Sequence, residues 1–134
     1  MAETLELVRR AYAALETRDY DALAQLAVPD FELDVTERVF NPATYQGEEG
    51  LRRFFAEVDE LWDSMDLTVE RLVERDDEVL ALLLVDIVGR GSGLKLQDRI
   101  AQHWTAREGK LVRMRVRADQ AAALAQFEAG GPAH

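Results

Sequence analysis

The chain contains no cysteine and only two histidines among its 134 residues. Without cysteine it can form no disulfide, has no thiolate nucleophile and offers no cysteine ligand to a metal ion. A metal centre needs several converging ligands, and one of the two histidines, His134, lies in the tail. We therefore expect no metal and no cofactor. We expect a cytoplasmic location, because a chain without disulfides suits a reducing compartment.

Positive charge and long apolar runs are also scarce. The sequence has 16 lysines and arginines against 26 aspartates and glutamates, a formal net charge of −10. A nucleic-acid partner requires a positive surface, so we expect none, and the acidity favours neutral or cationic ligands over anionic ones. Glu3 and Glu6 interrupt any apolar stretch at the N-terminus, which argues against a signal peptide. No run approaches the roughly 20 apolar residues that span a bilayer, so we expect no membrane partner.

Apolar residues at helical spacing predict three helices in the first half of the chain. The first covers residues 4–17, with Thr4 capping its N-terminus. The second begins at Asp19 and is stopped by Pro29, because the residue before a proline is pushed out of the helical region. The third has the strongest pattern and follows a loop that runs from Asn41 to Gly47. Its apolar positions are Leu51, Phe54, Phe55, Val58, Leu61, Trp62 and Met65.

Three segments in the middle of the chain have strand patterns. Alternating apolar and polar residues predict half-buried strands over 31–35 and 67–75. Residues 79–88 are apolar except for Asp86, so both faces of this strand should be covered.

The last third of the chain predicts two long strands and a helix. Strands over 94–107 and 110–117 flank a tight turn at Glu108-Gly109. Asp119 then caps an alanine-rich helix that ends at Gly130. Helices first and a meandering sheet last indicate a curved sheet wrapped around helices, with a pocket between them.

Three pairs of short motifs follow one another along the chain. They are Ala11-Tyr12-Ala13-Ala14-Leu15 with Asp19-Tyr20-Asp21-Ala22-Leu23, then Tyr45-Gln46-Gly47 with Leu51-Arg52-Arg53-Phe54-Phe55, and finally His103-Trp104-Thr105 with Glu108-Gly109-Lys110-Leu111-Val112-Arg113. In this order they resemble the nuclear-transport-factor-2-like superfamily, and within it the SnoaL-like branch, a polyketide cyclase and ketosteroid isomerase-like group.

The resemblance implies an α+β fold. In this family a cone-shaped, curved mixed β-sheet wraps around N-terminal helices, a C-terminal helix follows, and the cone encloses an apolar cavity. We assign residues 1–129 to a single domain of this kind and residues 130–134 to a flexible tail. Because the fold hosts isomerases, cyclases, dehydratases, epoxide hydrolases and non-catalytic modules, function must be argued from individual residues.

Two chemistries of the superfamily lack their residues in this chain. An ungapped match to the isomerase branch places Ala11 at the tyrosine position, Val35 at the general base and Gln102 at the protonated acid of the oxyanion hole. Steroid-type isomerisation is therefore disfavoured. Epoxide hydrolysis needs Arg-x-Asp on one strand, whereas here Asp98 and Arg99 are adjacent and so point to opposite faces.

Cyclase chemistry of the SnoaL type needs one acid or base beside a carbonyl, and three aspartates are candidates. Asp86 is the only charge in its apolar strand, and its alternative role is an ion pair with an arginine on the outer sheet face. Asp34 could instead face solvent, because its apolar strand neighbours claim the core side. Asp98 has the same strand parity as Gln102, so it could lie at the cavity rim.

A pocket for a small, flat, apolar ligand is the most specific expectation for binding. Gln102 is its favoured polar group, because the resemblance implies that its matched position faces the cavity. An amide there can hydrogen-bond a ligand carbonyl but cannot act as an acid or base at neutral pH. His103 would lie on the opposite strand face. The residues expected to line the pocket are Tyr12, Val35, Tyr45, Phe54, Phe55, Trp62, Gln102, Trp104 and Met114.

Two classes of function remain open. The chain could bind a small hydrophobic molecule and act as an isomerase, cyclase or dehydratase on a carbonyl-containing ring compound. Alternatively, it could be a non-catalytic ligand-binding or dimerisation module. Leu80, Leu82 and Leu84 would share the outer sheet face with alternating arginines. With no helix left to cover this face, we expect a homodimer through it.

Overall fold

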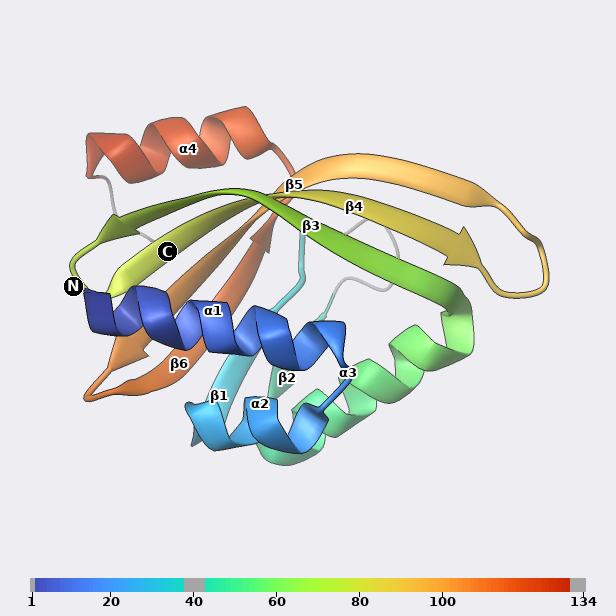
Figure 1. The fold of residues 1–134 in the computed structure, drawn as a ribbon, viewed down its shortest axis with the longest axis horizontal. Coiled ribbons are helices and arrows are strands. Elements are labelled where there is room, and N and C mark those ends of the chain that lie inside the picture. The colour runs from blue at the N-terminus through green and yellow to red at the C-terminus, as the bar shows by residue number, and fades with distance from the viewer. Residues whose placement is uncertain (1, 38–42, 131–134) are drawn as a thin grey trace.

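The structure is a computed structural model that describes residues 2–37 and 43–130. Four helices and a six-stranded sheet follow one another along these residues (Figure 1). The helices are α1 (Ala2–Glu16), α2 (Tyr20–Leu26), α3 (Gly47–Leu61) and α4 (Gln120–Ala129). The strands are β1 (Ala27–Asp34), β2 (Thr44–Gln46), β3 (Trp62–Arg75), β4 (Glu78–Gly89), β5 (Lys95–Arg107) and β6 (Lys110–Arg117).

The strands form one open sheet in the order β2-β1-β6-β5-β4-β3. β1 and β6 are parallel and every other pair is antiparallel, so the sheet is mixed. Helices α1, α2 and α3 lie on one face of the curved sheet and α4 lies on the other (Figure 1). This is the predicted α+β cone. Within the described residues, none of the helices is long and apolar enough to cross a membrane.

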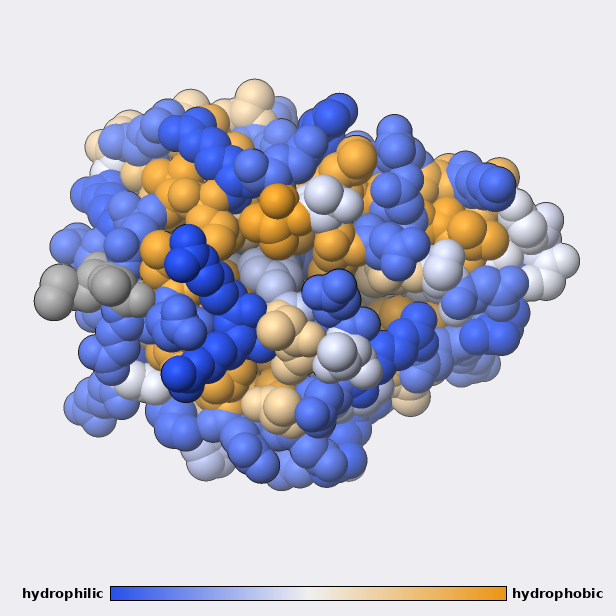
Figure 2. All heavy atoms as spheres, viewed as in Figure 1, coloured by the Kyte–Doolittle hydropathy of each residue, from blue (hydrophilic) through white to orange (hydrophobic). Residues whose placement is uncertain are grey.

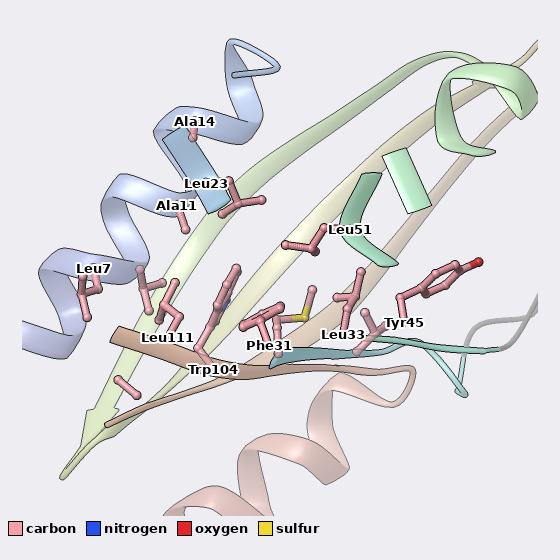
Figure 3. Close-up of a cluster of buried hydrophobic side chains, with 14 of the residues drawn as sticks. Leu7, Ala11, Ala14, Leu23, Phe31, Leu33, Tyr45, Leu51, Trp104 and Leu111 are labelled. Atoms are coloured by element: carbon pink, nitrogen blue, oxygen red, sulfur yellow. The ribbon is translucent and has the colours of Figure 1, made fainter. Parts of the chain in front are cut away.

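The main hydrophobic core fills the space between the first helix and the sheet. Leu7, Val8, Ala11 and Ala14 are the buried apolar residues of α1, and they face Trp104 across the core (Figure 3). Their spacing follows the helical repeat, which is why this helix presents a single apolar face to the sheet. The cap prediction at Thr4 was wrong, because α1 already includes Ala2 and Thr4 is buried in its first turn.

Aspartate caps begin two of the helices, as the sequence indicates. The carboxylate of Asp19 accepts a hydrogen bond from the backbone N–H of Ala22 at the start of α2. Asp119 does the same with Ala122 at the start of α4. Gly130 ends α4 in the left-handed conformation, with φ 75°, which glycine adopts at little cost.

The boundary between α3 and β3 differs from the prediction. The helical spacing predicts a helix that continues over Trp62 and Met65, but α3 ends at Leu61 and the backbone of Trp62 is already extended. The pattern misled because Met65 faces inward on a strand as it would have on a helix. β2, at Thr44–Gln46, occupies residues predicted as loop. The start of that loop, 41–42, lies outside the described residues, as does most of the predicted tail, 131–134.

The second helix and the first strand also meet earlier than expected. α2 ends at Leu26, before Pro29, and β1 runs from Ala27 through the proline. Pairing between β1 and β6 is irregular between Ala27 and Glu32, which is where a residue without a backbone N–H can be accommodated in a sheet.

The outer sheet face is partly covered, contrary to expectation. α4 packs on it, and Ala123 and Phe127 form a small second core with Leu80, Leu82 and Ala101. The prediction of an outer face without a helix was therefore wrong, because the chain turns after β6 and α4 packs against β4 and β5. The homodimer stays a prediction without the support of an uncovered patch.

Candidate functional site

A cavity of about 1000 Å³ lies between the inner face of the sheet and helices α1, α2 and α3. This is the upper end of the size range of small-molecule sites. Its wall is mostly apolar and aromatic. The apolar lining residues are Tyr12, Leu15, Tyr20, Leu23, Ala27, Phe31, Leu33, Val35, Leu51, Phe54, Phe55, Val58, Met65, Leu67, Val69, Val85, Ile87, Leu96, Ile100, Trp104, Leu111, Met114, Val116 and Ala118.

The register of the sheet shows which side chains share the inner face. Residues paired across neighbouring strands lie on the same side, and alternate residues of a strand lie on one face. Trp104 is paired with Val79 and Met114, and Gln102 with Ala81 and Val116. Further along β5, Ile100 is paired with Leu83, Asp98 with Val85, and Leu96 with Ile87. Gln102 and Asp98 therefore stand on the inner face, four residues apart on one strand.

Three polar side chains are hydrogen-bonded to one another among these apolar residues. The indole Nε1–H of Trp104 donates to the hydroxyl oxygen of Tyr12 at 2.9 Å. The hydroxyl of Tyr12 donates in turn to the amide oxygen of Gln102 at 2.6 Å. Trp104 and Gln102 are 2% and 7% exposed. Burial raises the pKa of Tyr12 far above its ordinary value, and the hydrogen bond from Trp104 opposes this only partly. The phenol therefore stays neutral at any physiological pH.

This chain of donors fixes the orientation of the Gln102 amide. An indole N–H can only donate, so the Tyr12 oxygen must accept from Trp104. The hydroxyl proton of Tyr12 then needs an acceptor, and the amide oxygen of Gln102 is the one in reach. Turning the amide over would present two donors to Tyr12 and leave its proton unpaired in a buried site, which is costly. The Gln102 NH₂ group, which has no partner among the described residues, is thus left to the cavity that Gln102 lines.

Aromatic rings from α2 and α3 form the opposite wall. Phe54 and Phe55 line the cavity, as expected from the sequence. Phe55 is stacked on Tyr20, with ring centroids 3.9 Å apart and planes 9° from parallel. Tyr20 was not expected here, although its spacing of three residues from the buried Leu23 could have indicated it.

Five more of the residues expected from the sequence also line the cavity: Tyr12, Val35, Gln102, Trp104 and Met114.

Two expected lining residues lie elsewhere. Tyr45 is buried but directs its hydroxyl away from the cluster (Figure 3), to the carboxylate of Glu57 at 2.6 Å. Trp62 begins β3 beside Gly89 of β4. Neither is among the residues that line the cavity.

The three candidate aspartates are separated by the sheet. Asp34 lies on the outer face, where its carboxylate accepts hydrogen bonds from Thr36 and contacts Arg113 and Arg115 at 3.3 and 3.7 Å. Burial acts to raise the pKa of Asp34, but the two hydrogen bonds from Thr36 and the charges of Arg115 and Arg113 together lower it. Asp34 is thus an ionised partner of the β6 arginines.

Asp86 also has the outward strand parity, since it is paired with Gln97 of β5 and accepts a 2.8 Å hydrogen bond from its amide. Asp98 alone of the three lines the cavity. It is exposed, at the rim, and its carboxylate accepts a hydrogen bond from the backbone N–H of Arg99. Only Asp98 is therefore positioned to meet a molecule inside the cone.

His103 points outward, as its parity with Gln102 predicts. Its Nε2 lies 2.7 Å from Glu78 and its ring packs edge-on against Phe127 of α4. Within residues 2–37 and 43–130, no group of three or more histidine, aspartate or glutamate side chains is arranged to hold a metal ion.

The sequence profile of the SnoaL-like domain matches residues 8–114, and the chain belongs to this family. No curated protein matches it by sequence.

Solved structures share the fold at low identity. One is an NTF2-like protein of unknown function from Burkholderia pseudomallei K96243, with a TM-score of 0.79, 18% identity, and 93% of this chain and 97% of that chain covered. A second is a proposed SnoaL-like polyketide cyclase from Jannaschia sp. CCS1, with a TM-score of 0.76, 18% identity, and 98% and 94% covered. A third, from Catenulispora acidiphila DSM 44928, has a ketosteroid isomerase-like fold and was solved in complex with trimethylamine (TM-score 0.73, 20% identity, 95% and 94% covered).

Proposed function

We propose that this protein binds a small, flat, apolar molecule that carries a carbonyl or similar hydrogen-bond acceptor. The ligand would lie in the cavity against the aromatic wall of Phe54, Phe55 and Tyr20. Its acceptor would face the NH₂ group of Gln102. Large apolar pockets with a few oriented polar groups are the usual form of a small-molecule site. Two proteins of the same fold support a small-molecule role, one named as a proposed SnoaL-like polyketide cyclase and one solved in complex with trimethylamine.

The observation that carries this proposal is the unpaired donor of a buried amide. Gln102 is 7% exposed, and only its amide oxygen has a hydrogen-bond partner among the described residues. The amide nitrogen is not one of the buried unpaired side-chain atoms of the described residues, so it is accessible from the cavity, where a ligand acceptor can take its hydrogen bond. Tyr12 and Trp104 hold the amide in the orientation that makes the donor available.

Binding is better supported than acid or base catalysis at the inner end of the cavity. An amide does not exchange protons at neutral pH, and the phenol of Tyr12 is held neutral. The cavity carboxylate nearest to Gln102 in sequence, Asp98, stands four residues away along β5, which is ~13 Å of extended strand. A general base must be within hydrogen-bond reach of the proton it removes. A carbonyl held by Gln102 would therefore not present its neighbouring carbon to Asp98.

Isothermal titration with neutral polycyclic ketones tests the proposal. 2-(Hydroxymethyl)anthraquinone and fluorenone are suitable probes, and Gln102→Leu should weaken the binding of both by about tenfold, the effect of losing a buried hydrogen bond. Gln126→Leu is the matched control, since Gln126 belongs to α4, is not among the residues that line the cavity and accepts a hydrogen bond from Arg117. Absence of binding to the wild-type protein, or equal losses in the two variants, would refute the proposal.

The catalytic alternative has its own test. A base in the cavity would exchange the protons beside the carbonyl of 2-tetralone in D₂O, and Asp98→Asn would slow that exchange. Exchange at the rate of buffer alone would support a binding role without turnover.

A further inference from the structure

The charged residues of the cavity wall are unbalanced. Among the described residues that line it, the acids are Glu16, Glu37, Asp66 and Asp98, and Arg18 is the sole base. Arg18 is already engaged, because its Nη1 lies 2.6 Å from the carboxylate of Asp59. An anionic ligand would therefore meet acids and an arginine that already has a partner.

The arginines of β6 do not correct this imbalance, because they serve the outer face. Arg113 contacts Glu32 at 3.0 Å, and Arg117 contacts Glu37 at 3.0 Å. Arg115 lies between them, 3.6 Å from Glu37. Glu37 is thus neutralised by two guanidinium groups.

Of the two cavity acids that belong to strands, Asp66 and Asp98, only Asp98 has the inward parity. Asp66 is paired with Asp86, so its side chain has the outward strand parity. Asp98 is paired with Val85, an inward-facing residue that also lines the cavity. No ion pair of Asp98 exists among the described residues, and its one hydrogen bond comes from the Arg99 backbone.

A second, independent feature of the same wall points to a ligand. The NH₂ group of Gln102, a side chain more than nine-tenths buried, is a donor without a partner on the same strand and face as Asp98. A molecule seated in the cavity thus meets a hydrogen-bond donor at the inner end and a carboxylate at the rim. A ligand that matches both groups needs a hydrogen-bond acceptor at its inner end and a cationic group at the end near the rim.

We infer that the cavity selects ligands that carry an amine or other cationic group at one end and a carbonyl acceptor at the other. This inference rests on the proposed function and adds its charge preference. Asp98 binds the cation at the rim, where solvent screens the interaction. We expect an amine to bind about threefold more tightly than the matched alcohol, the effect of an exposed ion pair. The protein carries a net charge of −10, which should further weaken the binding of a matched compound that carries a carboxylate.

A matched set of three compounds provides the test. 2-(Aminomethyl)anthraquinone, 2-(hydroxymethyl)anthraquinone and anthraquinone-2-carboxylate share one ring system and differ in charge. Titration at low ionic strength should give the order amine, alcohol, carboxylate, and added salt should compress the differences. Asp98→Asn should remove the advantage of the amine over the alcohol.

Asp86→Asn is the control, because it removes one negative charge from the outer face of the same sheet. The inference is overturned if Asp86→Asn has the same effect as Asp98→Asn, which would show that only overall charge matters. It is also overturned, with the proposed function intact, if the alcohol binds and the amine binds no better. If none of the three compounds binds, both the proposed function and the charge preference fall.

Discussion

Tyr12 and Gln102 are 90 positions apart in the sequence, yet the hydroxyl of one donates a 2.6 Å hydrogen bond to the amide oxygen of the other. The bond joins α1 to β5 across the main core. It therefore contributes to stability and, by orienting the Gln102 amide, to the chemistry of the cavity. These two contributions can be measured separately.

A double-mutant cycle of Tyr12→Phe and Gln102→Leu should reveal strong coupling. Tyr12→Phe leaves the Trp104 N–H and the Gln102 amide oxygen without partners, and we expect a loss of about 1–3 kcal/mol in the free energy of unfolding. The double variant should lose less than the sum of the single variants, by about 1 kcal/mol or more. Urea denaturation measures all four proteins. Tyr12→Phe combined with Gln97→Leu is the control and should be additive; additivity in both pairs would contradict the network.

The carboxylate of Asp34 should matter for stability and not for ligand binding. Asp34→Asn removes the negative charge that accepts hydrogen bonds from Thr36 and contacts Arg113 and Arg115. We therefore expect the free energy of unfolding to fall by about 1–3 kcal/mol. The pKa of Asp34 is lowered by folding, so its stabilising contribution is present above the ordinary value of 3.8 and is lost as the pH falls through the lowered value. Urea denaturation from neutral to acid pH measures this dependence.

Asp98→Asn is the comparison for Asp34, since Asp98 is exposed and should change stability by less than about 0.5 kcal/mol. A variant of Asp34 that loses ligand affinity at unchanged stability would return this residue to the list of functional groups.

His103 should make the protein less stable in mild acid. Burial lowers the pKa of His103, the hydrogen bond and charge of Glu78 raise it, and Arg117 and Arg113 lower it further, with a net decrease. The unfolded chain then binds a proton near pH 6.5 that the folded protein does not. Stability is therefore complete above that pH and declines below it, until the lowered pKa is reached.

His103→Gln keeps a donor for Glu78 and removes the titration, so the free energy of unfolding should vary less between pH 7 and pH 5. Urea midpoints across that range measure the slope, and an NMR titration of the His103 ring gives its pKa directly. A ring that titrates at or above 6.5, or equal slopes in the two proteins, would show that burial does not dominate at this position.

The C-terminal third of the fold could be predicted from the sequence because its signals are local. β6 matches the predicted strand at both ends, and the turn at Glu108-Gly109 has positive φ at both residues, as a two-residue hairpin requires. The caps Asp119 and Gly130 also act within a few residues of their own positions. The family resemblance placed Gln102 on the inner face, and strand alternation then placed His103 on the outer one; the structure has both residues on those faces.

The features that sequence analysis missed depend on distant partners. Trp62 lies on a strand because β4 pairs with it, although its spacing fits the preceding helix. Tyr45 is an aromatic residue of the kind that lines apolar pockets, but its hydroxyl donates a hydrogen bond to Glu57 of α3 and so points away from the cavity. The free donor of Gln102 follows from Tyr12 and Trp104 together, and no pattern near residue 102 encodes it.

Several large apolar side chains of this acidic protein are exposed on its surface. Polar residues cover most of the face shown in Figure 2, with hydrophobic residues visible between them, including at the end occupied by the β4–β5 hairpin. Leu94 and Leu96 of that region are 56% and 38% exposed.

Removing the side chain that anchors α4 should both destabilise the protein and increase its self-association. Phe127 packs with Leu80, Leu82 and Ala101 on the outer sheet face, and Phe127→Ala should cost about 3–5 kcal/mol as a large-to-small core substitution. A loosened α4 would expose the leucines of β4, and these exposed leucines would promote self-association. Sedimentation velocity would detect the association as a sedimentation coefficient that rises with protein concentration more than that of the wild-type protein. Phe54→Ala is the matched control, because Phe54 is half-buried and lines the cavity on the other side of the sheet. It should destabilise less and leave association unchanged; equal association in both variants would mean that α4 does not shield this face.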